Sequence, residues 1–209
     1  MRPWIKKVPA LVILILMKDI LALVTIMLWP VIPIYWIPVH FATEFFRKLG
    51  RLTYLLIALM WLLVAYSIFI NRAPLIAHRT VFPISLLIAG VILLAAGTLL
   101  HIWTANLLSL SGIIGIPEIV TPQKSKLIDK GPFAVVRHPT YLAHTMIFLG
   151  IYFITGVTAV GILTLADFIV VNAALIPFEE KELLQRLGEP YRRYITMVPR
   201  MIPRISRKR

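Results

Sequence analysis

The sequence predicts an all-α fold, a multi-pass transmembrane helical bundle of about five spans that ends in a helical hairpin and a cytoplasmic amphipathic helix. Two observations support it. The 209 residues are 59% hydrophobic, which exceeds what a water-soluble core of this length uses. The apolar residues also gather in stretches of about 20, the length that crosses the hydrocarbon core. We therefore expect residues 1–209 to form a single integral membrane domain.

The first apolar stretch, residues 9–38, is too long for one straight span. Three prolines between residues 30 and 38 each remove a backbone donor and obstruct the preceding helical turn. We expect one spanning helix to about Trp29, followed by a broken or interfacial piece that carries Tyr35 and Trp36.

Four further stretches have the length and composition of a span. They cover residues 53–71, 82–105, 139–156 and 158–177. The last two are separated by only a few residues around Gly156, so they should form an antiparallel helical hairpin. The chain then continues as a polar and apolar mixture typical of an amphipathic surface helix.

The charge distribution predicts the orientation. The chain carries 22 Lys and Arg against 9 Asp and Glu, a formal net charge of +13. With five spans, sixteen of the basic residues fall on one side of the membrane and five on the other, which predicts a cytoplasmic C-terminus. Because these residues lie between or after apolar spans, we expect contacts with membrane lipids and no nucleic-acid partner. The sequence has no Cys, and we expect no metal site.

The hairpin brings distant polar residues to one membrane face. His138 lies about 18 residues before the turn and the Glu179/Glu180 pair about 22 after it, so each arm is about 30 Å long. Together with Arg137 and Tyr141 they should form one polar cluster at the cytoplasmic boundary. Arg137 and free N–H groups at the helix entrance suit a carboxylate or phosphate, and the Glu pair suits a cation, a ribose diol or an amino group.

The segment GPFAVVRHPTY, followed by a hairpin and by EEKELLQRLGEPYRRY and VPRMIP, resembles the isoprenylcysteine carboxyl methyltransferase family and its phospholipid methyltransferase relatives. The resemblance covers about the last 85 residues. It implies a membrane-embedded methyltransferase that uses S-adenosylmethionine without a Rossmann domain, and the sequence contains no G-x-G-x-x-G. Residues 1–105 would then be N-terminal membrane helices and residues 106–209 the cofactor-binding catalytic half.

Carried over position by position, the resemblance and the polar cluster predict the residues of the site. The cofactor-binding set is Leu127, Ile128, Phe133, Arg137, His138, Pro139, Tyr141, Glu179 and Glu180. The predicted catalytic residues are Glu180 and Tyr141. Methyl transfer from a sulfonium is an in-line displacement, so holding donor and acceptor together supplies most of the catalysis.

The acceptor is expected to be a lipophilic small molecule or a lipid-modified substrate that arrives from the bilayer. The family more often has Tyr at the position of Phe133, and its prenylcysteine enzymes carry an Arg shortly before the Glu pair, where this chain reads NAALIPFEE. An isoprenylcysteine carboxylate and a lipid headgroup amine are therefore comparable candidates. An amine needs a base, for which Glu179 or Glu180 is the nearest group.

Two other functions fit the same motifs. Membrane sterol reductases have a similar R-H-P-x-Y end and use NADPH there, although they are usually longer. A non-catalytic scaffold or transporter that kept the hairpin is the third reading.

Several polar residues lie at membrane depth. Asp167 and Asn172 lie on roughly one side of the last span, where they would either line an acceptor pocket or form an interhelical hydrogen bond. His101 and His144 have no second ligand at helical spacing, so we interpret them as packing residues and not as metal ligands.

Overall fold

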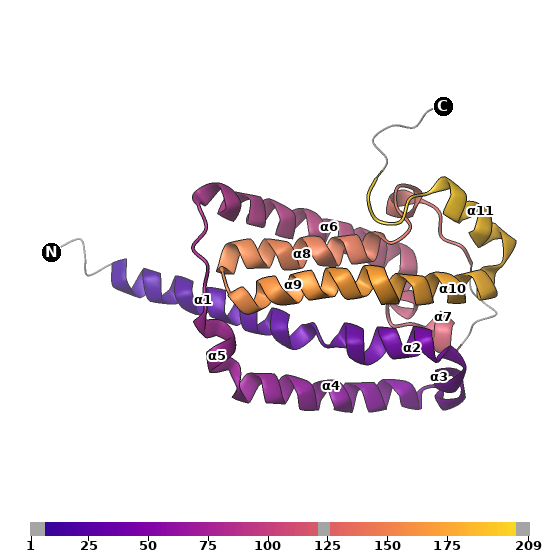
Figure 1. Cartoon of the computed structure of the whole chain (residues 1–209), viewed down its shortest axis with the longest axis horizontal. Coiled ribbons are helices and arrows are strands. Elements are labelled where there is room, and N and C mark those ends of the chain that lie inside the picture. Colours follow the sequence, from indigo (N-terminus) through magenta and orange to yellow (C-terminus); the bar gives the residue numbers. More distant parts are fainter. Residues whose placement is uncertain (1–6, 121–125, 204–209) are drawn as a thin grey trace.

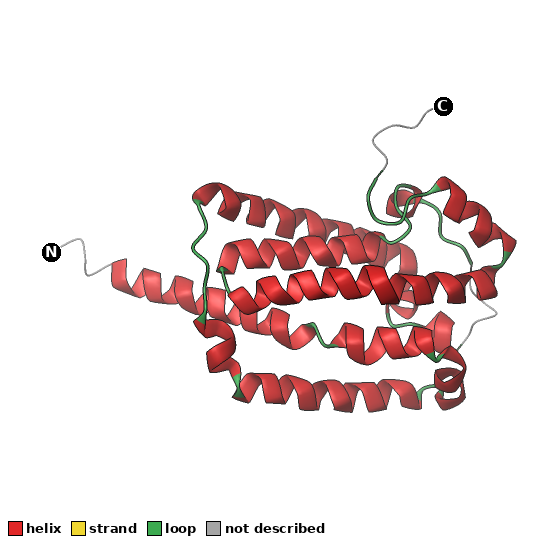
Figure 2. Ribbon diagram, viewed as in Figure 1, coloured by secondary structure: helices red, strands yellow, loops and turns green. Residues whose placement is uncertain are grey.

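The computed structural model describes residues 7–120 and 126–203. Within these ranges the chain is helical, with turns and one isolated β-bridge and with no strand (Figure 2). The long helices lie side by side along one axis. The hairpin turn and α5 are at one end, and the shorter helices α2, α3, α7 and α11 gather at the other (Figure 1). The predicted all-α fold is therefore confirmed.

The first half contains α1 (Lys7–Leu28), a π-helical segment (Ile32–Trp36), α2 (Ile37–Phe41), α3 (Thr43–Leu49), α4 (Leu52–Ile70), α5 (Arg72–Ala77) and α6 (Ile84–Ile113). The second half contains α7 (Ile116–Ile119), a 3₁₀ turn (Gly131–Ala134), α8 (Pro139–Thr155), α9 (Thr158–Val170), a π-helical segment (Val171–Leu175), α10 (Ile176–Leu187) and α11 (Glu189–Met197).

Four of these helical stretches are long and apolar enough to cross a membrane: Ala10–Phe41, Leu52–Ile70, Ile84–Ser109 and Thr158–Leu187. The fifth predicted span corresponds to α8, an apolar helix that is shorter than these. Many Leu and Ile side chains of α1, α4 and α6 are exposed, as they are in a protein whose solvent is lipid. The chain is therefore an integral, multi-pass membrane protein.

The helix is interrupted only briefly in the proline-rich region, residues 30–38. α1 ends at Leu28, close to the predicted Trp29. The chain then re-enters a helix through the π-helical segment Ile32–Trp36, which holds Tyr35 and Trp36, and continues into α2. A π-turn widens the helix locally, so it accommodates Pro33 without ending the helical course.

Glycines allow α6 and α8 to pack backbone against backbone. A Cβ atom on Gly97 would lie 2.9 Å from the Ala143 carbonyl oxygen, and one on Gly150 would lie 2.7 Å from the Gly90 carbonyl oxygen. Close approach through small residues is the usual basis of helix association in lipid, where no hydrophobic force drives it. This contact fixes α8, which begins directly after His138.

The predicted hairpin is present. α8 ends at Thr155, Gly156 adopts φ 70°, and α9 begins at Thr158. The turn is tied to the loop after α5, because the Thr80 N–H donates to the Gly156 carbonyl at 2.7 Å and the Thr158 N–H donates to the His78 carbonyl at 2.9 Å. The returning arm does not stop at residue 177, since α9, the π-helical segment and α10 continue to Leu187.

The predicted amphipathic helix is the end of α10 together with α11. Gly188 has φ 64° and ends α10, so that α11 turns back toward the bundle. Leucines of α10 then pack against Tyr191, Tyr194 and Val198. This packing places the C-terminal segment beside the start of α8.

Candidate active site

Glu180 is the centre of an ion-pair network at the start of α8. Its Oε1 accepts from Arg137 Nε at 3.0 Å and lies 2.8 Å from Arg137 Nη2. The same oxygen is 3.0 Å from His138 Nε2, and Oε2 accepts from Arg200 Nη2 at 3.2 Å. Both carboxylate oxygens are therefore occupied, and the side chain is only 12% exposed.

The C-terminal segment closes this network. Arg137 Nη1 also donates to the Ile195 carbonyl at 3.1 Å and to the Val198 carbonyl. The backbone N–H groups of Arg137 and His138 donate to the carbonyls of residues 199 and 200 at 2.8 Å and 3.0 Å. We expected these N–H groups and the guanidinium to be free for an anion. In the structure they hold the chain that follows α11.

Glu179 has a different environment from its neighbour. Tyr141 hydrogen-bonds to the Glu179 carboxylate. Oε2 of Glu179 is buried, has no hydrogen-bond partner among the residues that the structure describes, and lies 3.6 Å from His138 Nδ1. A buried carboxylate oxygen without a partner is costly unless a ligand satisfies it.

His138 links the two carboxylates. Its imidazole is buried, with Nε2 toward Glu180 and Nδ1 toward Glu179, and it stacks on Tyr141 with ring centroids 5.8 Å apart. Burial lowers the pKa of His138, but its hydrogen bond to Glu180 and its ion pair with Glu179 outweigh the burial and raise the pKa above its ordinary value of 6.5. The site therefore favours the protonated imidazole.

Two cavities meet at this cluster. One, of about 230 Å³, extends between the end of α1, α6 and α8, and the other, of about 120 Å³, extends toward α10 and α11. Both are lined by Leu108, Phe133, Arg137, His138 and Glu179. We call the first the membrane cavity and the second the tail cavity.

The structure places most of the predicted site residues on these cavities. Leu127 and Ile128 line the tail cavity, Tyr141 lines the membrane cavity, and Phe133, Arg137, His138 and Glu179 line both. Pro139 and Glu180 line neither. Pro139 is almost fully buried at the first turn of α8, and Glu180 is enclosed by its cationic partners.

Other residues of the site were not predicted. Tyr191 lines the tail cavity with a buried hydroxyl that has no hydrogen-bond partner in residues 7–120 and 126–203, and the Tyr194 hydroxyl donates to the Phe133 carbonyl at 2.6 Å. Burial raises the pKa of both phenols, so they remain protonated. The spacing of these tyrosines in GEPYRRY was the available signal. Arg200 lies in VPRMIP, a segment that carries the resemblance, but nothing in the sequence assigned it to the polar cluster.

The two polar residues of the last predicted span, Asp167 and Asn172, have different hydrogen-bond partners. Asp167 is buried and accepts from Trp29 Nε1 at 3.1 Å, which is the interhelical hydrogen bond we considered. Asn172 donates to the Phe168 carbonyl within its own helix.

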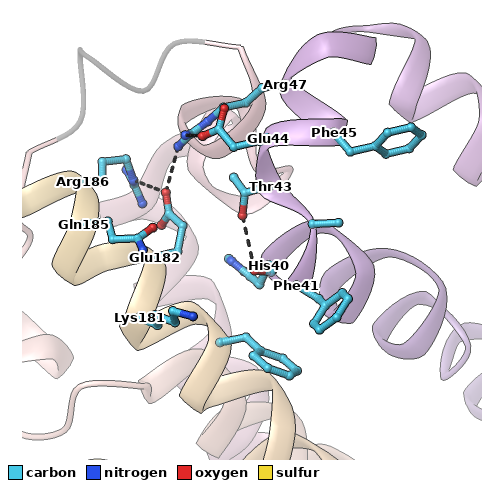
Figure 3. Close-up of a pocket in the computed structure, with 12 residues that line it drawn as sticks. His40, Phe41, Thr43, Glu44, Phe45, Arg47, Lys181, Glu182, Gln185 and Arg186 are labelled. Carbon is cyan, nitrogen blue, oxygen red and sulfur yellow. Dashed lines mark hydrogen bonds and ion pairs between the residues drawn. The ribbon is translucent and has the colours of Figure 1, made fainter.

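The largest cavity lies on another side of α10. It measures about 700 Å³ and is lined from α2, α3 and α10, with Arg47, Lys181, Glu182, Gln185 and Arg186 among its walls (Figure 3). Glu182 Oε1 accepts there from Arg47 at 3.2 Å and from Arg186 at 2.9 Å. Among the predicted site residues, none lines this pocket.

Comparisons with known proteins give one finding. The chain matches the phospholipid methyltransferase family over residues 85–189, which extends upstream of the resemblance seen in the sequence and includes almost all of α6. No curated protein matched, and no solved structure matched. The matched region is half of the chain and contains the hairpin, His138 and both members of the Glu pair. The chain therefore belongs to the phospholipid methyltransferase family and is an S-adenosylmethionine-dependent methyltransferase that acts on a lipid acceptor.

Proposed function

We propose that this protein methylates the headgroup amine of a membrane phospholipid, with Glu179 between the two substrates. The observation that carries the proposal is that Glu179 lines both cavities and keeps one buried carboxylate oxygen without a hydrogen-bond partner among the described residues. The methyl donor, which is larger than the tail cavity of about 120 Å³, would occupy the tail cavity and its junction with the membrane cavity. The membrane cavity, which lies against α1 and α6, would hold the acceptor.

The residues of the tail cavity fit S-adenosylmethionine. The Glu179 carboxylate suits the amino group or the ribose diol of the donor, and the buried Tyr191 hydroxyl offers a second unsatisfied polar group. Leu127, Leu183 and Leu187 supply apolar surface for the adenine. When bound, the donor supplies a methyl group on an electrophilic sulfonium. Leu127, Ile128, Phe133, Arg137, His138 and Glu179 remain the proposed binding residues.

Glu180 takes a positioning role in this proposal, in place of the catalytic one that the sequence predicted. Its two oxygens are held by Arg137, His138 and Arg200, so it fixes the start of α8 against the C-terminal segment. That contact orients the His138 ring, and His138 with Tyr141 orients Glu179. Glu179 then accepts a proton from the ammonium of the acceptor, which leaves the amine free to attack.

The charges lining the membrane cavity favour an amine over a carboxylate. Arg137 is the only Lys or Arg among its lining residues, and its guanidinium is engaged by Glu180 and by two backbone carbonyls. An acidic acceptor would find the Glu179 carboxylate, while Arg137 and the protonated His138 are already paired with Glu180. A cationic headgroup would pair with the Glu179 carboxylate.

The orientation of the protein is part of the proposal. The cavities lie at the end of the bundle that carries α2, α3 and α11 (Figure 1). This end also carries the larger share of Lys and Arg, which supports a cytoplasmic C-terminus and a donor that enters from the cytoplasm.

The test is methyl transfer by the purified protein in lipid nanodiscs, with radiolabelled S-adenosylmethionine. Phosphatidylethanolamine should be labelled, and N-acetyl-S-farnesylcysteine should be labelled poorly. Glu179→Gln should lower the rate by about 100-fold or more, the usual contribution of a general base. Glu189→Gln is the matched control, since Glu189 is exposed on α11, and its rate should stay within about twofold of wild type. Preferred labelling of the farnesylcysteine would contradict the proposal.

A further inference from the structure

The membrane cavity contains two histidines that the proposed chemistry does not use. His101 comes from α6 and His144 from α8, and both line the cavity. The walls contributed by α1, the π-helical segment after it and α6 are otherwise mainly apolar, with Leu28, Ile32, Leu108 and Ile113. A cavity that served only a hydrocarbon chain would have no need of imidazoles.

Neither imidazole is satisfied within the protein. Nδ1 of His101 and Nε2 of His144 are buried and have no hydrogen-bond partner in the described part of the chain. Oδ2 of Asp167 is 3.7 Å from His144 Nε2, beyond hydrogen-bond distance, and Trp29 donates to the other oxygen, Oδ1. Unpaired polar groups at membrane depth are costly, so their presence here needs an explanation.

The two histidines lie at a similar depth, below the reacting end of the cavity. His144 is six residues after His138, which corresponds to about 9 Å along a helix. Gly97 of α6 packs against Ala143 and Ile147 of α8, and His101 is one turn further along α6 in the direction of His138. His144 is therefore separated from His138 by about the length of a lipid headgroup, and His101 lies within about one helical turn of the depth of His144.

We propose that His101 and His144 recognise the acyl-ester carbonyls of the acceptor phospholipid while its amine lies at Glu179. This inference rests on the proposed function and specifies the substrate further, because it requires ester-linked chains. A neutral imidazole donates one N–H, and a carbonyl oxygen accepts it. Ether-linked lipids and prenyl chains have no carbonyl at that position, so both would leave the imidazoles unpaired.

The test compares two phosphatidylethanolamines that have identical chains and headgroups, one diester and one diether. Their affinities are measured in detergent by displacement of a fluorescent phospholipid, in the presence of S-adenosylhomocysteine. Wild type should bind the diester about threefold to tenfold more tightly, as expected for one or two net hydrogen bonds. The double variant His101→Leu/His144→Phe should lower diester affinity to the diether value, each single variant should lower it part of the way, and diether affinity should be unchanged.

Two further variants separate recognition from packing. His144→Gln keeps a donor of similar reach and should retain most of the diester preference. His78→Phe, at an exposed histidine in the loop after α5, should behave as wild type. Equal affinity of wild type for the two lipids would overturn the inference, and so would an equal loss of both affinities in His144→Phe.

Methyl transfer measured on the same samples distinguishes this inference from the proposed function. If the protein prefers the diester in binding but transfers no methyl group to the amine, the proposed function is wrong and the recognition of ester carbonyls by the histidines stands. If both lipids are bound equally tightly and methylated at equal rates, only the recognition of ester carbonyls by the histidines is wrong.

Discussion

Glu179 and Glu182 are three residues apart on α10, yet they face two different regions of the molecule. Glu179 faces the meeting point of the membrane and tail cavities, with Tyr141 and His138 beside it. Glu182 faces the wide pocket of Figure 3, where Arg47 and Arg186 both donate to it. On both sides Oε2 is buried without a hydrogen-bond partner among the described residues; on the pocket side two guanidiniums donate to the other oxygen of Glu182, and on the cavity side the neighbours of Glu179 are the His138 imidazole and the Tyr141 hydroxyl.

This difference shows which acidic residue the protein has left for a ligand. A buried carboxylate held by two guanidiniums contributes to structure, because its charge is already compensated. Glu179 lines both cavities and has an imidazole and a phenol as its neighbours, so its carboxylate is the one that a ligand in either cavity can reach. Cavity size points the other way, since the widest pocket lies beside Glu182.

The largest effect on stability is expected at Glu180, because its ion pairs hold Arg137 and His138, which line both cavities. Glu180→Gln removes the charge that holds Arg137, His138 and Arg200, so the free energy of unfolding should fall by about 3–5 kcal/mol. Thermal unfolding in detergent measures it, with Glu189→Gln as the control. A loss below about 1 kcal/mol would show that the network contributes little.

A smaller effect is expected on the pocket side. Glu182→Gln weakens the contacts with Arg47 and Arg186, and the unfolding free energy should fall by about 1–3 kcal/mol. The affinity for S-adenosylmethionine, measured by isothermal titration calorimetry, should stay within about twofold of wild type, because Glu182 lines neither cavity and only its partner Arg186 also lines the tail cavity. A tenfold loss of that affinity would break the comparison between the two regions.

The stability of the folded protein should also depend on pH through His138, which lies at the two cavities. Its pKa is raised in the folded protein, so its contribution to stability is present below its ordinary value of 6.5 and is lost as pH rises through the folded pKa. Wild type should therefore become less stable between neutral and alkaline pH. His138→Gln should flatten this part of the profile, and an unchanged slope in the variant would assign the effect to other groups.

The smallest effect on stability should come from Glu179 itself. Glu179→Gln removes a buried charge that faces the protonated His138 and accepts from Tyr141, so the unfolding free energy should fall by about 0.5–1.5 kcal/mol. Differential scanning fluorimetry of the purified variant measures this. A loss comparable to that of Glu180→Gln would mean that Glu179 is structural as well.

The sequence was sufficient to predict the convergence of His138 with the Glu pair. Two apolar stretches joined at Gly156 leave little freedom in where their ends meet, since helix rise and membrane thickness set the arm lengths. Sequence alone could not distinguish Glu179 from Glu180, because adjacent residues on a helix point about 100° apart and the rotation of α10 depends on packing.

Two other features also lay beyond sequence reasoning. Arg200 and the carbonyls near Val198 reach the site because α11 folds back at Gly188, a tertiary contact that the motif VPRMIP does not specify. His101 and His144 are single histidines on apolar helices, where spacing gives no indication of a shared cavity. The role assigned to them follows from their placement in three dimensions.

An experimental structure of the protein with S-adenosylhomocysteine and phosphatidylethanolamine would test the central claim most directly. The account predicts the nucleoside in the tail cavity beside Tyr191 and Leu183, and the lipid amine within hydrogen-bond distance of Glu179. A nucleoside bound in the wide pocket beside Lys181 and Gln185, or an amine remote from Glu179, would contradict it.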